Sequence, residues 1–177
     1  AKLFESLQGG MCPMITCFKL GNNMLADQAV GPLMVEVLRA ETCMITTLDL
    51  SGNNISGAVI ARAIQLNKSL TSLDLRDNPP IDDTALWVLG GLLLGEACQC
   101  KLGYLRTYAF EVIEDSQSVD FRDMKLEGGA AKLLAGVIRF NPIVEALCLS
   151  GCSLEGSTTT ALAQALLWNS MLKSIDL

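Results

Sequence analysis

The stretches ITTLDLSGNNI (Ile45 to Ile55) and LTSLDLRDNPPI (Leu70 to Ile81) share the frame Leu-x-x-Leu-x-Leu-x-x-Asn-x-Ile/Leu, with one extra proline in the second copy. A third copy, ITCFKLGNNML, runs from Ile15 to Leu25 and has Phe18 as its first inner residue. A frame that returns along the chain is the signature of a repeat architecture, because one such unit cannot bury its apolar face alone. The sequence therefore predicts a stack of similar units.

Later copies keep the frame without its asparagine. SQSVDFRDMKL (116–126) and VEALCLSGCSL (144–154) carry Met124 and Cys152 at that position, and LKSIDL (172–177) begins a further copy. If the first residue of each Leu-x-Leu pair is taken as an anchor, successive anchors lie 30, 25, 46, 28 and 28 residues apart: Phe18, Leu48, Leu73, Val119, Leu147 and Ile175. The gap of 46 indicates one degenerate repeat, which we place at Cys100-Lys101-Leu102 within an irregular short repeat over residues 96–118.

Between the strands the apolar period changes from two to about 3.6, which is typical of amphipathic helices. The predicted helices are Ala26 to Arg39, Ser56 to Leu66, Asp82 to Leu94, Glu127 to Phe140 and Glu155 to Trp168. Side-chain oxygens that can cap the helix starts are present on Asp27, Ser56, Asp82 and Ser157. Three helices end on the same signal, an asparagine three residues before the next apolar strand position: Asn67, Asn141 and Asn169.

This alternation of strand and helix in units of about 28 residues resembles the ribonuclease-inhibitor-like branch of the leucine-rich-repeat family. The resemblance implies an α/β fold, a right-handed solenoid arc with a parallel concave sheet of six or seven strands and five convex helices. Residues 1–177 then form a single domain of about six repeats. The resemblance also implies that Asn23, Asn53 and Asn78 satisfy backbone groups at the turn after each strand, and that this ladder lapses at Met124 and Cys152.

The alternation also predicts which side chains form the core. Leu48, Leu50, Leu73 and Leu75 are expected to point inward from the sheet, and the helices are expected to close the core with Ile60, Ile64, Leu86, Leu89, Leu133, Leu134, Leu162 and Leu166. LKSIDL ends inside a strand, and the segment from Ala1 to Met14 is too irregular for a full repeat. We therefore expect these residues to be a fragment of a longer array, or the last strand to lie against another subunit.

Strand alternation assigns a strip of charged side chains to the solvent side of the concave sheet. It consists of Lys19, Asp49, Asp74, Arg76, Lys101, Asp120, Arg122 and Asp176. Two interpretations are open: a recognition strip for a protein partner, or a solvated surface common to such repeats. The second is favoured by the absence of aromatic residues from these rows, because binding hot spots are rich in Trp, Tyr and Arg.

Aromatic side chains gather instead in the irregular short repeat, where Tyr104, Tyr108 and Phe110 lie close together in the sequence. A repeat that interrupts the solenoid and carries aromatic residues is a candidate docking point for a partner. The alternative is that these rings fill an irregular corner of the core.

Composition argues against several function classes. The net charge of −6 and only 13 basic residues give no basic stripe for nucleic acid or anionic lipid. The chain has no His, Cys98 and Cys100 lack a second cysteine pair, and no phosphate-binding glycine motif is present, so no catalysis, cofactor, metal or small-molecule substrate is expected. The longest apolar stretch, Ala85 to Gly95, is far shorter than the roughly 20 residues that cross a bilayer.

The seven cysteines are an odd number without the spacing of a disulfide scaffold. They indicate reduced thiols, buried except for Cys148 and Cys17, in an intracellular, reducing compartment. The cytoplasm is the first choice, and an organelle is the alternative if a targeting peptide has been removed.

Two function classes remain, and both have another protein as the partner. The first is a non-catalytic protein–protein interaction module or structural subunit that braces a larger multi-subunit assembly. The second is a regulator of a bound enzyme, of the small-GTPase-activator or enzyme-inhibitor type found among leucine-rich-repeat proteins. The resemblance permits the second class, but no residue singles it out.

Overall fold

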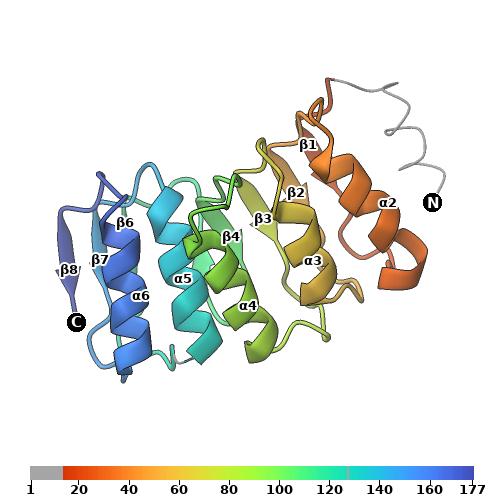
Figure 1. Ribbon diagram of the computed structural model, residues 1–177. Helices are drawn as coiled ribbons and strands as arrows, with labels where there is room; N and C mark the ends of the chain where they lie inside the picture. The colour runs from red at the N-terminus through yellow and green to blue at the C-terminus, as the bar shows by residue number, and fades with distance from the viewer. Residues whose placement is uncertain (1–13, 127) are drawn as a thin grey trace.

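The computed structural model describes residues 14–126 and 128–177. Figure 1 shows the helices side by side in one layer, with the strands in a second layer behind them. The strands are β1 (Cys17–Lys19), β2 (Thr47–Asp49), β3 (Ser72–Asp74), β4 (Tyr104–Arg106), β5 (Glu111–Val112), β6 (Ser118–Asp120), β7 (Ala146–Cys148) and β8 (Ser174–Asp176). The helices are α2 (Asp27–Arg39), α3 (Gly57–Ile64), α4 (Asp83–Leu94), α5 (Gly128–Phe140) and α6 (Gly156–Leu166). The chain is an α/β solenoid, as the repeated frame predicts.

Parallel pairing places the anchors of successive repeats beside one another. Phe18 pairs with Leu48, and Leu48 pairs with Leu73. The three anchors of β6, β7 and β8 are paired in the same way. The predicted strands and their register are therefore confirmed on both sides of the irregular repeat.

The core lies between the strand layer and the helix layer. Leu48, Leu50, Leu73 and Leu75 are each at most 3% exposed, which confirms their predicted burial. The residues predicted to close the core from the helices are also buried, except for Leu166, which is 38% exposed. The buried stripe of α6 is Thr158, Ala161, Leu162 and Ala165, and Leu166 lies beside that stripe on the last helical turn.

The strand of the degenerate repeat lies later in the chain than the predicted Cys100-Lys101-Leu102. This strand is β4, in which Leu105 pairs with Leu73, whereas Cys100 and Leu102 lie buried in the segment that leads to it. Leu102 and Leu105 stand at the first two positions of the Leu-x-x-Leu frame, but Thr107 replaces the next leucine. Cys100 and Leu102, two apolar residues separated by one residue, resemble the Leu-x-Leu pair that this repeat lacks.

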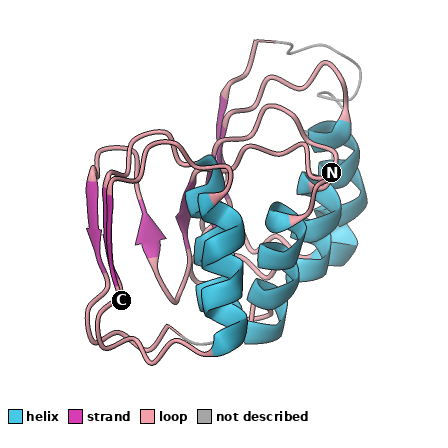
Figure 2. Ribbon diagram, turned by 60° about the vertical axis from the view of Figure 1, so that its left-hand side comes forward, coloured by secondary structure: helices cyan, strands magenta, loops and turns pink. Residues whose placement is uncertain are grey.

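The repeat that contains β4 has no helix. The chain turns back after β4, and β5 pairs antiparallel with it, Leu105 opposite Val112. Strand β6 then begins a second sheet, so the strand layer consists of a five-stranded and a three-stranded sheet rather than one parallel sheet. Figure 2 shows the strands and the helices as separate layers in side view.

The helix layer stays continuous because α4 and α5 pack directly against each other through glycines. A Cβ atom at Gly90 of α4 would lie 2.6 Å from the backbone nitrogen of Leu133, and one at Gly136 of α5 would lie 2.8 Å from Cβ of Leu93. Close backbone approach of this kind needs residues without a side chain. Helix α5 is consequently buried along most of its length, from Gly129 to Ile138 with few interruptions.

One ladder of asparagines joins the repeats at the turn after each strand. The Asn53 amide donates to the carbonyl oxygens of Leu20 and Leu50, each at 2.9 Å, and its oxygen accepts from the backbone N–H groups of Asn23 and Leu25. Asn78 makes the corresponding bonds one repeat further on, including 2.9 Å to the Leu50 oxygen. The predicted role of these asparagines is confirmed.

The ladder lapses only in part beyond these repeats. Met124 is exposed and has no amide to offer, as predicted. Cys152 is buried, and its thiol donates to the Phe121 carbonyl oxygen at 2.9 Å, so it keeps one of the bonds that an asparagine would make.

A second set of asparagines lies at the opposite turns, after α3, α5 and α6, where the helix leads to the next strand. The Asn67 amide donates to Leu38 O at 2.6 Å, and its oxygen accepts from Leu70 N at 2.7 Å. Asn141 and Asn169 repeat this pattern, donating to Gly103 O and Ile138 O respectively and accepting from the backbone N–H groups that follow them. The shared helix-end signal is therefore a structural link between adjacent repeats.

Helix starts are capped in two ways. Ser56 and Asp82 cap their own helices, as predicted, by accepting from Val59 N and Ala85 N. Asp27 is the first residue of α2 and not its N-cap, which is Ala26; its Oδ1 accepts from Ser56 N in the next repeat. The N-cap of α6 is Glu155, which makes no side-chain cap bond, so Ser157, inside the helix, is not the predicted cap.

The thiols only partly follow the expected burial. The described cysteines are all free; Cys100 and Cys152 are buried, Cys17 is exposed, and Cys43, Cys98 and Cys148 are half-buried. Burial raises the pKa of Cys100 to about 12. Cys12 lies outside the described residues.

We expect Asn53→Ala to lower the free energy of unfolding by roughly 2–4 kcal/mol, because it leaves several buried backbone groups unpaired. Asn54→Ala is the matched control: its exposed side chain makes no hydrogen bond in the described structure, and a change within about 0.5 kcal/mol is expected. Urea unfolding of the two variants measures the difference. Equal midpoints would show that the ladder does not stabilise the stack.

We expect Gly90→Ala to destabilise the chain by about 1–3 kcal/mol, because the new methyl group would overlap the backbone of α5. In Gly91→Ala the methyl group would meet only the flexible end of Lys132, at 3.3 Å. Alanine has the higher helix propensity, so this neighbouring substitution should be neutral or stabilising by up to about 1 kcal/mol. Thermal unfolding of both variants separates the two cases, and a stabilised Gly90→Ala would contradict the close packing of α4 on α5.

Candidate functional site

The charged residues of the predicted strip share a local structural role. Here "strand face" means the side of the strand layer that points away from the helices. On this face Asp49, Asp74 and Asp120 each accept a hydrogen bond from the backbone N–H two residues later, at 2.9, 3.1 and 3.0 Å. Aspartate favours such turns because its short side chain reaches its own backbone. Part of the strip is thus explained by turn formation.

Around β3 the strip is covered by the chain itself. Asp74 is only 6% exposed, and Arg76 binds both Asp74 (2.7 Å) and Glu111 of β5 (3.1 Å). Glu114 follows β5 and accepts a hydrogen bond from the Ser72 hydroxyl at 2.5 Å. The irregular repeat therefore folds over the strand face at β3, and Asp74 is not available to a partner, contrary to the prediction.

The N-terminal members of the strip are divided between two environments. Lys19 is exposed at the end of β1, whereas Asp49 is half-buried and also binds the Ser51 hydroxyl at 2.7 Å. Lys101 is exposed but lies ahead of β4, outside the strands, because the strand of that repeat begins later than predicted. The sheet register gives its place beside Asp74 to Arg106.

The second sheet keeps its charged side chains exposed. We name Asp120, Arg122 and Asp176 the C-terminal strip, and all three are exposed. The Arg122 guanidinium donates to both Asp120 carboxylate oxygens and lowers the pKa of Asp120 to about 2. Asp176 accepts a hydrogen bond from the thiol of Cys148, which lies between them. The strip therefore presents an ion pair and a second carboxylate to solvent at neutral pH.

The aromatic residues of the irregular repeat separate into three environments. Phe110 is 3% exposed and packs edge-on against Phe121, with ring centroids 6.1 Å apart, so its predicted docking role is wrong and it joins the core across the break between the sheets. Tyr104 is half-buried on β4, beside Ser72 in the sheet. Tyr108, at the turn between β4 and β5, is 60% exposed.

Tyr108 borders an open pocket of about 430 Å³ at the end of the repeat where β3 leads into α4. Its other lining residues are Leu75, Asp77, Asn78, Pro79, Ile81, Asp82 and Asp83. Desolvation raises the pKa of Tyr108, and the nearby Asp83 and Asp82 carboxylates raise it further. Sequence reasoning missed this pocket, because the aspartates and the tyrosine come from different segments and Asp82 was interpreted only as a helix cap.

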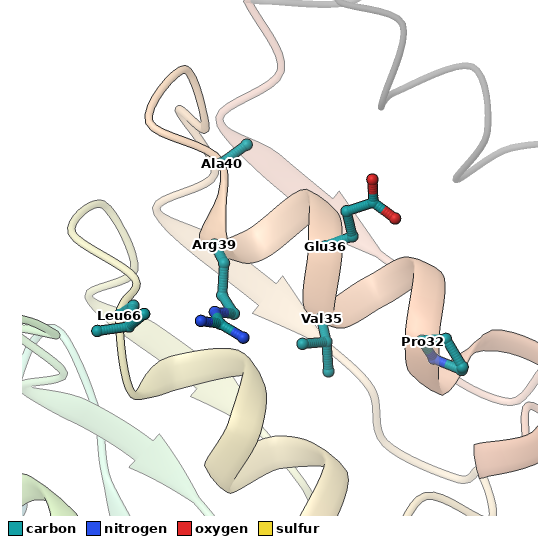
Figure 3. Close-up of a pocket in the computed structure, with 6 residues that line it drawn as sticks. All are labelled: Pro32, Val35, Glu36, Arg39, Ala40 and Leu66. Atoms are coloured by element: carbon teal, nitrogen blue, oxygen red, sulfur yellow. The ribbon is translucent and has the colours of Figure 1, made fainter.

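The helix layer carries further open pockets. Figure 3 shows one between α2 and α3, where Val35 and Arg39 extend from α2 toward the side of Leu66 while Glu36 points away. Another lies over α5, between the end of α4 and the end of α6, with Lys132 and Trp168 among its lining residues. The Lys132 ammonium lies 3.9 Å from the centre of the Trp87 ring, a cation–π contact within the helix layer.

Within residues 14–126 and 128–177, no group of three or more His, Cys, Asp or Glu side chains is arranged to hold a metal ion. In the same part of the chain, every helix is too short or too polar to traverse a lipid bilayer.

Comparison with known proteins identifies the repeat. The leucine rich repeat family matches residues 43–58 and 66–86, which contain the two best-formed frames. The mouse protein named NACHT, LRR and PYD domains-containing protein 12 is 32% identical over 153 residues, which cover 83% of this chain and 12% of that protein. Its human counterpart is 29% identical over 92% of this chain and 14% of its own length. The chain thus spans only a small part of these relatives.

Two further proteins extend the comparison. The zebrafish Tonsoku-like protein is 32% identical over 57% of this chain, which is 8% of its own length. The solved structure of leiomodin-1 actin-binding site 2 superimposes with a TM-score of 0.55 at 17% identity, covering 93% of this chain and 88% of that one. At that identity the likeness concerns the fold alone. Together with the asparagine-linked stack of parallel strands and helices, these matches show that the chain is a leucine-rich-repeat protein.

Proposed function

We propose that this chain is a non-catalytic protein–protein interaction module or a structural subunit that braces a larger multi-subunit assembly. Repeat solenoids build extended surfaces for such contacts. The NACHT, LRR and PYD relatives are much longer proteins in which the matching repeats are one part. This supports a role for the repeats alongside other domains or subunits. We place the repeats in the ribonuclease-inhibitor-like branch and the protein in a reducing, intracellular compartment, in keeping with its free thiols.

The observation that carries the proposal is the exposed C-terminal strip. The strand face at β3 is filled by Arg76, Glu111 and Glu114, but Asp120, Arg122 and Asp176 have no other segment over them in the described structure. A surface that carries both positive and negative charges favours a partner whose charges are arranged in the opposite pattern. Other proteins are disfavoured because they would bring like charges together. Proteins rather than nucleic acids or small molecules are the proposed ligands, in keeping with the net charge of −6.

We expect Arg122→Glu and Asp176→Lys each to weaken partner binding at least about fivefold, because each reverses a charge at the proposed contact. Affinity capture of the native complex with quantitative mass spectrometry measures the effect. A brace should recover a stable assembly in fixed proportions.

Lys68→Glu is the control, since Lys68 pairs with Glu41 near the helix-to-strand turns and away from the strip. Its capture should match that of the unmodified chain, and all three variants should unfold at similar temperatures. If Arg122→Glu and Asp176→Lys retain the full assembly, the C-terminal strip is not the contact. If an enzyme is recovered instead and its activity changes on binding, the chain is a regulator and not a brace.

A further inference from the structure

The pocket beside Tyr108, which we name the Tyr108 pocket, combines three kinds of surface. Its apolar lining residues are Leu75 and Ile81, both nearly buried, and the exposed Pro79. Tyr108 also lines the pocket and is 60% exposed. The carboxylates of Asp77, Asp82 and Asp83 supply the polar part of the lining. A concave, mostly apolar site with a few convergent polar groups is the usual form of a binding site.

Two of these carboxylates make hydrogen bonds within the chain and can still accept further ones. Asp82 uses Oδ1 to cap α4, and Asp83 uses Oδ1 to accept from Gly129 N and Ala130 N of α5. These bonds do not neutralise the charge of either residue and leave Asp82 Oδ2 without a hydrogen bond in the described structure, whereas Asp83 Oδ2 lies close to Gly128 at the start of α5. None of the ion pairs among the described residues involves Asp77, Asp82 or Asp83. Among the described residues, the pocket is therefore lined by carboxylates that no cation pairs with.

Charge complementarity identifies the occupant. Carboxylates attract a cation by their charge, and a neighbouring aromatic ring adds a cation–π contact to the ion pair. A guanidinium suits this combination better than an ammonium, since it is planar, stacks on aromatic rings and donates two parallel hydrogen bonds to one carboxylate. The apolar part of the lining can cover the methylene groups of such a side chain.

We propose that the Tyr108 pocket binds an arginine side chain presented by a protein partner. The inference rests on the proposed interaction function and adds a second, separate contact on the strand-to-helix end of the stack. The irregular repeat creates the site, because the turn after β4 brings Tyr108 beside the loop that follows β3. The docking role predicted for the aromatic cluster thus belongs to Tyr108 and not to Phe110.

The test titrates the 177-residue chain with the peptide acetyl-Gly-Arg-Gly-amide and follows its amide signals by NMR. Saturable shifts should appear at residues 75–83 and at Tyr108, and they should weaken as salt is added. The same peptide with citrulline, an uncharged analogue of arginine, should give no saturable shifts. Equal binding of the citrulline peptide would overturn the charge argument, and equal binding of a lysine peptide would overturn the guanidinium argument.

Three variants locate the site without removing its structural bonds. Asp77→Asn keeps a residue that tolerates the positive φ of 54° there, and Asp82→Asn keeps a good helix cap. Tyr108→Leu removes the ring but not the apolar surface. Each should raise the Kd at least fivefold, whereas Glu41→Gln, which removes one distant negative charge, should not. Unchanged binding in all three variants would refute the proposed site.

The results of the peptide experiment can be distinguished from those of the C-terminal strip variants. If the arginine peptide fails to bind but Arg122→Glu still loses the assembly, the pocket proposal fails and the interaction function stands. If the peptide binds as described while the strip variants retain the assembly, the pocket survives and the proposed contact surface is wrong.

Discussion

The structure depends on satisfying backbone groups at the bends between strands and helices. Such bends expose N–H and C=O groups inside the stack, where water cannot reach them. The asparagine ladder and the second set of asparagines meet this need with side chains that donate and accept at once: Asn53 bonds to the preceding repeat through Leu20, Asn23 and Leu25. Because each amide bonds across to a neighbour, the interaction that completes one turn also fixes the spacing of the next.

The repeated frame allowed much of the fold to be predicted from the sequence. Strand register, helix positions and the buried leucines follow from periodicity, since core-facing positions recur at intervals set by backbone geometry. The errors fall where the frame is degraded. Thr107 stands where a leucine would mark the strand, so the strand was assigned to Cys100 and Leu102 instead of Leu105. Without that signal, the missing helix after β4 and the antiparallel β5 could not be foreseen.

The candidate sites were less accessible to sequence reasoning, because they depend on contacts between segments. Alternation placed Asp74 on the strand face correctly, but not the arrival of Glu111 and Glu114, which come from a part of the chain with no repeat pattern. The burial of Phe110 and the exposure of Tyr108 have the same origin, since both depend on how one turn packs against its neighbours. The local sequence predicts which side of a strand a residue faces. Whether that residue is accessible to a partner depends on distant segments that can cover it.

The missing helix has a consequence for cooperativity. In a solenoid, unfolding spreads from one unit to the next through the coupling between neighbours. At β5 and β6 the hydrogen-bond ladder stops, and the two halves are held together by the glycine-lined contact of α4 with α5, the Phe110–Phe121 pair and a few side-chain bonds such as that from Asn141 to Gly103. The apolar part of this coupling weakens on cooling. We therefore expect the coupling between the repeats of the two sheets to depend on temperature more than the coupling within either sheet, where the strand ladder is continuous.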